Sequence, residues 1–332
     1  MVNEIQSWPA LNSPYTYLHK LFADPPIFVV SAGLLLDSGV KLALKTAQGR
    51  DCFIVVQPSW DLHLQAGHIA SYIHATKLKN HSVQFVVICP TPQEVHLLNA
   101  LGVDALHVHK NAFIDEKIFH PKLGIKKQYD AVHIASVEKF KRHSLAWNIR
   151  NIAVITYGYQ AVIDLSELQG YKYLAFGNFK ISNEGSTLEA PLSPINVNEI
   201  ICLSNCGLIL SEEEGTNNAS TEYLLSGIPV VSTPSRGGRN ELFDPRHVYI
   251  AKPCSDSIED AVEYFRNNHL DPFEIRESVL IKIREHRVRF LNWLCQASKQ
   301  DLYLHADKNF WIPSFVNKLR MTIPITKDLI EL

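Results

Sequence analysis

The stretch LILSEEEGTNNASTEYLLSGIPVVSTPSRGGRNE, residues 208–241, alternates short apolar runs with glycine turns. The first apolar run ends at acidic residues and Gly215, and the second run ends shortly before Gly237 and Gly238. A short apolar run that is bounded by turn residues is typical of a buried strand. The pattern therefore predicts a strand, a glycine turn, a helix, a second strand and a second glycine turn. Repeated units of this kind build parallel α/β sheets.

The helix within this stretch is expected to begin at Thr216 or Asn217, because both residues are good N-caps. It is expected to stop at Gly227, and Pro229 prevents its continuation. The free N–H groups and the positive dipole end of such a helix favour a phosphate. A phosphate-binding position beside Gly215 follows, since a glycine lets a ligand approach the backbone.

Two carboxylates, Glu214 and Glu222, lie at the first turn and inside this helix. Their eight-residue spacing corresponds to roughly 12 Å along a helix, about the length of a sugar diphosphate. Together with Gly237, Gly238 and Glu241, the pair resembles the donor-site signature of retaining GT-B glycosyltransferases. The resemblance implies that Glu214 lies near the donor sugar and that Glu222 binds the ribose hydroxyls. The alternative is an ordinary solvated helix start with a surface glutamate.

The same resemblance implies a donor site around the turn that holds Gly215, Thr216, Asn217 and Asn218. The segment ASVEKFKRHSLAW follows a predicted strand and is similar to the family's phosphate-binding turn. Lys141 matches the lysine that grips the diphosphate, so the resemblance assigns catalytic roles to Glu214 and Lys141.

The family's arginine position falls on Ser136, which departs from the pattern. Arg142 or Arg236 would be the replacement, or the helix start would supply the charge by itself. A solvated turn remains the alternative for the KFKR segment.

Two further segments resemble the family. HKNAFIDEKIFHP is similar to its interdomain signature, with Asn111 and Phe119 in structural positions. Pro191–Ile195 is similar to the loop that stacks on the nucleotide base, with Leu192 and Ser193 as contacts. The resemblance covers roughly residues 105–290.

Apolar strand-like runs fall into two series on either side of a polar stretch at about 114–128. We therefore expect two Rossmann-like α/β domains, and the resemblance implies a GT-B arrangement with parallel sheets facing across a cleft. The predicted divisions are a shortened N-terminal, acceptor-side domain at 1–115, a C-terminal nucleotide-sugar domain at 116–300, and a segment at 301–332 that packs back on the first domain. The runs of the two series are 27–33, 52–56, 84–90 and 105–110, then 129–135, 152–157, 172–177, 206–211, 228–233 and 247–252.

The segment QPSWDLHLQAGH supplies acceptor-side candidates, namely Trp60, Asp61, His63 and His68. An aspartate or histidine held near a hydroxyl can act as a general base. A loop or helix-surface position is the alternative for each. The two histidines are five residues apart, which is not the spacing of two ligands on one helix face. No metal and no cofactor are expected, and GT-B donor binding requires no metal.

Composition excludes several classes of protein. The 332 residues are 46% hydrophobic and carry a net charge of −2, so no nucleic-acid partner is expected. The N-terminus lacks a signal-like apolar segment, and a cytoplasmic protein is expected. The region 303–320 carries basic and aromatic residues (Trp311, Phe315, Lys318 and Arg320) and either crosses back onto the first domain or contacts a membrane surface peripherally. Six cysteines lack CxxC spacing and are expected to be reduced core residues: Cys52, Cys89, Cys202, Cys206, Cys254 and Cys295.

These patterns predict a glycosyltransferase that moves a sugar from a nucleotide-sugar donor to a polysaccharide, a lipid-linked sugar or a small molecule, with retention. The alternative is a non-catalytic module that binds a sugar nucleotide or a glycan, which the short first domain and Ser136 favour. A dinucleotide-dependent oxidoreductase fits the strand pattern, but no GxGxxG follows any predicted strand, and SAGLLLDSG at 31–39 lacks that spacing.

Overall fold

A computed structural model describes most of the chain as two compact units. The first unit comprises residues 1–115 and 283–332, and the second comprises residues 116–282. The described residues are 15–32, 36–58, 61–157, 165–171, 176–177, 179–182, 185–188, 192–302 and 322–324. Trp60, Pro191 and the residues 303–320, for which contacts were predicted, lie outside them.

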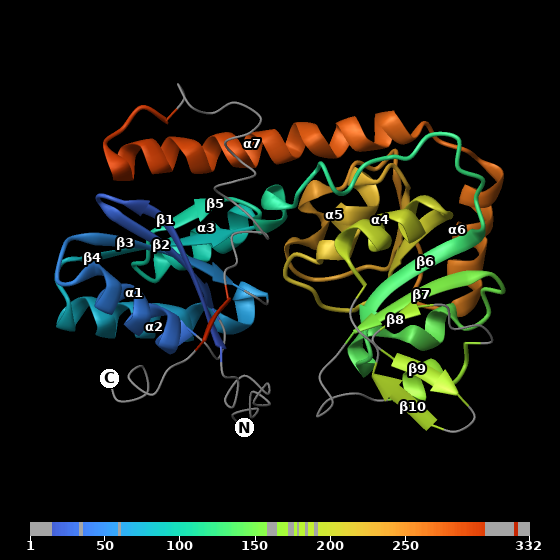
Figure 1. Cartoon of the computed structure of the whole chain (residues 1–332), viewed down its shortest axis with the longest axis horizontal. Helices are drawn as coiled ribbons and strands as arrows, with labels where there is room; N and C mark the ends of the chain where they lie inside the picture. Colours follow the sequence, from blue (N-terminus) through green and yellow to red (C-terminus); the bar gives the residue numbers. More distant parts are fainter. Residues whose placement is uncertain are drawn as a thin grey trace. The chain divides into compact units, whose positions relative to one another are not determined.

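The first unit contains a six-stranded sheet with the order β14-β1-β2-β3-β4-β5 (Figure 1). The strands from β2 to β5 pair in parallel, whereas β1 pairs antiparallel with both β2 and β14. The strands are β1 (Tyr15–Ala23), β2 (Pro26–Ala32), β3 (Cys52–Pro58), β4 (Val83–Cys89), β5 (Ala105–His107) and β14 (Thr322–Pro324). The helices are α1 (Leu36–Ala47), α2 (Leu62–Lys79), α3 (Pro92–Ala100) and the second half of α7 (Pro272–Ser298).

Alternate residues of these strands build two cores, one on each face of the sheet. Phe28 and Val30 pack with the helices that follow the strands, in a core that also holds Val40 of α1 and Ile69 of α2. Ile27 and Val29 belong to the opposite core, which contains Phe290, Leu291 and Leu294 of α7. Successive side chains of a strand point to opposite faces, so both faces are covered and the strands read as continuous apolar runs.

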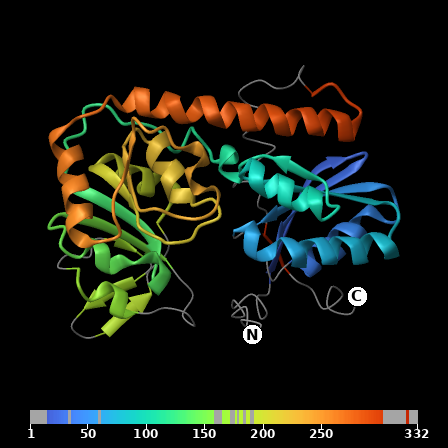
Figure 2. The same ribbon diagram turned by 180° about the vertical axis from the view of Figure 1, so that it is seen from behind.

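The second unit contains a separate, wholly parallel sheet (Figure 2). Its six strands have the order β13-β12-β11-β6-β7-β8. A hairpin of β9 and β10 follows β8. The strands are β6 (Tyr129–Ser136), β7 (Ile152–Tyr157), β8 (Phe176–Gly177), β9 (Phe179–Ser182), β10 (Gly185–Leu188), β11 (Ser204–Ile209), β12 (Val230–Ser232) and β13 (Val248–Ile250). The helices are α4 (Pro194–Cys202), α5 (Asn218–Leu225), α6 (Ser255–Asn267) and the first half of α7.

Strand β11 shows how this second sheet is covered on both faces. Cys206 and Leu208 face a core that holds Ile258 of α6. Gly207 faces Tyr223 of α5, and a Cβ at this position would come 2.1 Å from the tyrosine ring. The Tyr223 hydroxyl accepts a hydrogen bond from the Ile134 backbone N–H of the neighbouring strand at 2.8 Å. The glycine is therefore required for close packing of α5 on the sheet.

Several predictions about local structure are confirmed. Two separate sheets form, and the predicted 85–89 and 129–135 strands lie in different ones. Helix α5 has Asn217 as its N-cap and ends before Gly227, whose φ is +77°. Helix α7 begins at Pro272, directly after Asp271, whose side chain accepts a hydrogen bond from the Phe273 N–H at 2.8 Å.

The prediction that all six cysteines are core residues is wrong in part. All six are free thiols, but Cys254 is exposed at the N-cap of α6 and Cys295 is only half-buried. An isolated cysteine in a turn has no apolar run around it, so it need not be buried. Among the described helices, none combines the length and the apolar character needed to cross a membrane.

Candidate functional site

The order of the strands in the second unit defines a switch point between β6 and β11. From β6 the chain continues to β7 and β8 on one side, and later returns to β11, β12 and β13 on the other side. In open α/β sheets, ligands bind outside the carboxyl ends of the strands at such a point. The segments that leave these two strands, 136–142 and 210–217, hold most of the predicted donor-site residues.

Lys141 and Glu214 form a buried ion pair at this point. Lys141 follows β6 and Glu214 follows β11, and their side chains are 9% and 11% exposed. Burial acts to raise the pKa of Glu214, but the Lys141 ammonium and three hydrogen bonds outweigh it and hold that pKa below its ordinary value. The two residues to which the sequence assigned catalysis are thus brought together by the fold.

The Glu214 carboxylate is held by two further donors. Ser211 donates its hydroxyl to Oε1 at 2.9 Å, and the Asn217 amide donates to the same oxygen at 3.0 Å. Asn217 also caps α5, since its side-chain oxygen accepts the Ser220 N–H at 2.9 Å. The start of helix α5 and the carboxylate are therefore fixed relative to one another.

Arg239 is a site residue that the sequence did not reveal. It follows the second glycine turn and is 1% exposed. One guanidinium nitrogen donates to the carbonyl and the hydroxyl oxygens of Ser211 at 3.0 and 3.2 Å, and the other donates to the Thr233 carbonyl. Burial lowers the pKa of Arg239 to about 10, against the opposing effect of the Glu214 carboxylate. The arginine remains charged at neutral pH and adds a second cation beside Lys141 and Glu214. Its position directly after Gly237 and Gly238 is the feature of the sequence that could have identified it as a site residue.

The three residues considered for the missing family arginine have local roles. Ser136 ends β6 and donates its hydroxyl to Glu138. Arg142 has a φ of +52°, and its guanidinium donates to the Leu210 carbonyl and, at 2.8 Å, to the Thr233 hydroxyl. Arg236 is 74% exposed and pairs with Glu213. Of these arginines, Arg142 joins the ends of β6, β11 and β12, whereas Arg236 lies at the surface.

Gly237 holds the two glycine turns against each other. Its φ is +92°, and a Cβ here would lie 2.1 Å from the Glu214 carbonyl oxygen. The turns are also joined by a parallel bridge between Glu213 and Arg236. Gly237, which the resemblance places in the donor-site signature, is therefore needed for the backbone that carries Glu214.

The remaining residues of the first turn lie at the start of α5. Gly215 and Thr216 are buried and precede the N-cap, and Glu222 is buried one turn along the helix from Asn218. Among the described residues, the Asn218 side-chain oxygen is a buried acceptor without a hydrogen-bond donor. Buried acceptors in native structures are rarely unsatisfied, so a water molecule or a ligand group would supply the donor.

Leu192 and Ser193, predicted to contact the nucleotide base, lie directly before α4. Ser193 is the N-cap of this helix and accepts the Asn196 N–H at 3.2 Å. Leu192 is half-buried. The capping role of Ser193 accounts for its position without a ligand, and the contact with a base stays a prediction.

The acceptor-side candidates in the first unit lie at the start of α2. Asp61 is buried and caps the helix by accepting the His63 N–H at 3.0 Å. His63 and His68 are exposed on the helix surface. The capping role of Asp61 accounts for its position without an acceptor, the two histidines lie at the surface, and contact with an acceptor stays a prediction.

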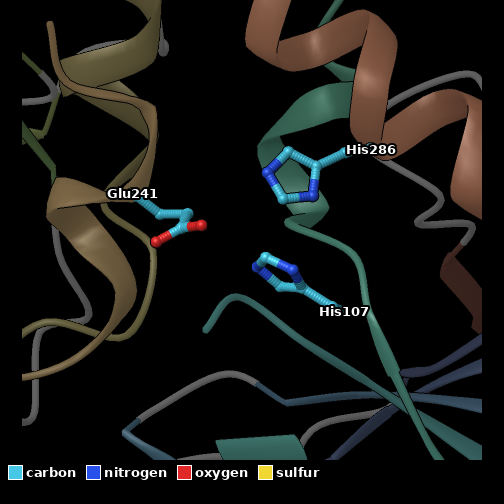
Figure 3. A group of neighbouring side chains, drawn as sticks. All are labelled: His107, Glu241 and His286. Carbon is cyan, nitrogen blue, oxygen red and sulfur yellow. The ribbon is translucent and has the colours of Figure 1, made fainter. Parts of the chain in front are cut away.

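Three histidines gather near the end of β5. The rings of His107 and His286 lie edge to face with their centroids 5.0 Å apart (Figure 3). Nδ1 of His286 accepts hydrogen bonds from the His109 N–H at 3.3 Å and from Arg289 at 3.1 Å. The ring proton of neutral His286 is then on Nε2, which leaves no free lone pair for a metal. Glu241, also drawn in Figure 3, belongs to the second unit.

The comparisons with known proteins identify the fold. No family model and no curated protein matches the sequence. The crystal structure of Anabaena HepE in complex with UDP-glucose is similar, with a TM-score of 0.52, 12% sequence identity, and coverage of 81% of this chain and 78% of that chain. The pneumococcal O-GlcNAc transferase GtfA in complex with UDP and GlcNAc has a TM-score of 0.48 and 13% identity, over 87% of this chain and 58% of that chain. The protein is an α/β protein with two parallel-rich sheets and the fold of GT-B glycosyltransferases.

Proposed function

We propose that the protein is a glycosyltransferase that transfers a sugar from a nucleotide-sugar donor to an acceptor with retention of configuration. The acceptor would be a polysaccharide, a lipid-linked sugar or a small molecule. The observation that carries the proposal is the buried Lys141–Glu214 pair at the switch point, beside the N-terminus of α5. The similar HepE structure holds UDP-glucose, and this supports a nucleotide-sugar donor.

Each group at the switch point has a place in this chemistry. The bond between the anomeric carbon and the diphosphate breaks, and negative charge develops on the leaving diphosphate. Lys141 and the N–H groups at the start of α5 would stabilise that charge in a buried setting, where it has most effect. Arg239 is buried beside Glu214 and adds positive potential.

The carboxylates would bind hydroxyl groups. Glu214 would orient the donor sugar through the oxygen that is not tied to Lys141, Ser211 and Asn217. Glu222, one turn along α5 from Asn218, would accept hydrogen bonds from the ribose hydroxyls. The acceptor hydroxyl then attacks the face of the sugar from which the diphosphate leaves, and its proton passes to the leaving diphosphate.

A non-catalytic module that binds a sugar nucleotide is the second candidate. The observation in its favour is Ser136, whose hydroxyl is held by Glu138 where the family places an arginine. The buried Arg239 weakens this argument, because a second cation is present near the pair.

A panel of UDP-, GDP- and ADP-sugars separates the two candidates. We expect slow release of free sugar from one donor, and a reduction of 10-fold or more in Lys141→Ala. Lys139→Ala is the matched control, because Lys139 is exposed on the same turn. Binding of a donor without hydrolysis or transfer would favour the module. Failure of every donor to bind would overturn both candidates.

A further inference from the structure

A buried network of two histidines and a tyrosine (His133, His143 and Tyr171) adjoins the turn that carries Lys141. His133 is on β6, His143 follows Arg142, and Tyr171 follows a short 3-10 turn. The Tyr171 hydroxyl lies 3.1 Å from Nδ1 of His133 and 3.1 Å from Nδ1 of His143. The three residues are 2%, 0% and 7% exposed.

The hydrogen bonds determine where each proton lies. Nε2 of His143 is 2.9 Å from the Ser136 carbonyl, which can only accept, so Nε2 carries the proton. Burial lowers the pKa of His143 to about 4, and Lys141 acts in the same direction, so the ring is neutral and its Nδ1 is an acceptor. The Tyr171 hydroxyl must then donate a hydrogen bond to this Nδ1, and its oxygen accepts a hydrogen bond from the Nδ1–H of His133.

A competing acceptor does not change this assignment. The Tyr171 hydroxyl is also 3.3 Å from the His143 carbonyl. If it donated there, its oxygen lone pair would face the unprotonated Nδ1 of His143 at 3.1 Å. Burial also lowers the pKa of His133 well below its ordinary value, so neither ring supplies an extra proton at neutral pH.

The network closes the loop on which Lys141 lies. The hydrogen bond from Nε2 of His143 to the Ser136 carbonyl joins residues seven positions apart, and Lys141 lies between them in the sequence. Within the loop, the Lys141 N–H donates to the Glu138 carbonyl at 2.9 Å. The left-handed backbone of Arg142 precedes His143 and is a strained conformation for a residue with a side chain. A strained residue persists only where its surroundings fix it, and the network supplies that constraint.

We propose that His133, Tyr171 and His143 form a positioning network that sets the Lys141 ammonium against Glu214 and thereby controls affinity for a diphosphate group. None of the three needs to touch the ligand. The proposed effect on diphosphate affinity rests on the proposed function, whereas the proposed placement of Lys141 does not.

The first test needs no ligand. A double-mutant cycle with Lys141→Met and Glu214→Gln, measured by urea unfolding, gives the coupling between the two side chains. We expect this coupling to fall at least twofold when the cycle is repeated in the Tyr171→Phe background, and to stay unchanged with Tyr264→Phe, which alters a half-exposed tyrosine on α6. An unchanged coupling with Tyr171→Phe would show general destabilisation only and would overturn the proposal.

The second test uses UDP and uridine as probes. Tyr171→Phe should weaken UDP binding about 10-fold, equivalent to about 1.4 kcal/mol, and leave uridine binding unchanged. Equal losses for the two probes would contradict positioning of a phosphate contact. If wild-type protein binds no nucleotide, the proposed function fails, and the coupling measurement still decides the role of the network.

A third measurement remains decisive if Tyr171→Phe does not fold. Nitrogen NMR of the wild-type imidazoles reports which ring nitrogen carries the proton. We expect Nε2–H for His143 and Nδ1–H for His133. An Nδ1–H tautomer of His143 would overturn the proposed direction of the network.

Discussion

Glu214 is a carboxylate that burial alone would drive toward its neutral form. Its pKa is nevertheless lowered, because Lys141, Asn217 and Ser211 stabilise the charged form. A carboxyl with a lowered pKa in the folded state contributes stability that is present above the unfolded value, near 4.5, and is lost as the pH falls through the folded value.

The first prediction follows from the lowered pKa of Glu214 in the folded protein. At pH 7, wild type should be more stable than Glu214→Gln, and the difference should shrink as the pH falls below 4.5. Urea unfolding at a series of pH values measures it, with Glu263→Gln on the surface of α6 as the control. A difference that grows toward acid pH would mean that Glu214 is not held as a carboxylate.

Gly237 carries the second prediction, also at the scale of one residue. Gly237→Ala combines a backbone that L-residues rarely adopt with a Cβ that overlaps the Glu214 carbonyl, and it should cost about 3 kcal/mol. Gly49→Ala is the matched control, since its φ is +76° but a Cβ there meets nothing within 4 Å. Strain alone should cost the control roughly 1–2 kcal/mol. Equal free energies of unfolding for the two variants would show that the overlap is relieved.

Single residues also show what the sequence could predict at the site. Lys141 and Glu214 stand in recognisable motifs, and the structure pairs them. Arg239 and Tyr171 were not predicted, because their partners come from distant segments: Arg239 binds Ser211, and Tyr171 binds His133 and His143. A motif reports residues that are close in sequence, whereas these contacts are created by the packing of separate strands.

At the scale of elements, Glu94 joins two helices of the first unit. Its Oε1 accepts the Leu62 N–H at the start of α2, at 3.3 Å. Its Oε2 accepts the Thr91 N–H at 3.2 Å and the Thr91 hydroxyl at 3.0 Å, which completes a capping box at the start of α3. One carboxylate thus satisfies donors at both helix N-termini.

The third prediction concerns this junction. Glu94→Gln keeps one acceptor oxygen but turns an amide N–H₂ toward the remaining donors, and it should destabilise the protein by about 2 kcal/mol. The control is Glu263→Gln on α6, where an exposed charge is removed and a change of less than about 0.5 kcal/mol is expected. Equal urea midpoints for wild type and Glu94→Gln would contradict the role of Glu94 as a shared cap.

Elements differ in how far the sequence predicts them. Strands such as β3 and β4 are continuous apolar runs because both of their faces are covered, and they were found. Strand β1 contains His19 and Lys20 and the β9–β10 hairpin lacks an apolar run, so neither was predicted. Their pairing depends on partners that the local pattern does not show.

At the scale of the whole molecule, the first unit is discontinuous in sequence. Residues 283–302 return to it after the second unit is complete, and Phe290 and Leu294 cover one face of its sheet. The sequence did not predict which sheet the second half of α7 would cover, because two sheets have apolar faces of similar composition.

The fourth prediction tests this organisation. Phe290 is fully buried, stacks on Trp293 and packs against Phe113, so Phe290→Ala should cost about 3–5 kcal/mol. Val288→Ala, on the same helix but 46% exposed, should change stability by less than about 0.5 kcal/mol. Urea unfolding followed by circular dichroism measures the loss of stability. A small effect of Phe290→Ala would mean that α7 does not form part of this core.

The central claim is that Lys141 binds a diphosphate at the switch point of the second unit, and calorimetry of UDP and uridine binding tests it most directly. A charge-assisted contact to phosphate contributes about 1.5–3 kcal/mol, so Lys141→Ala should weaken UDP binding roughly 10- to 150-fold and leave uridine binding nearly unchanged. Lys139→Ala, on the exposed side of the same turn, should bind both ligands as wild type does. Equal losses for UDP and uridine in Lys141→Ala, or no loss for either, would contradict the account.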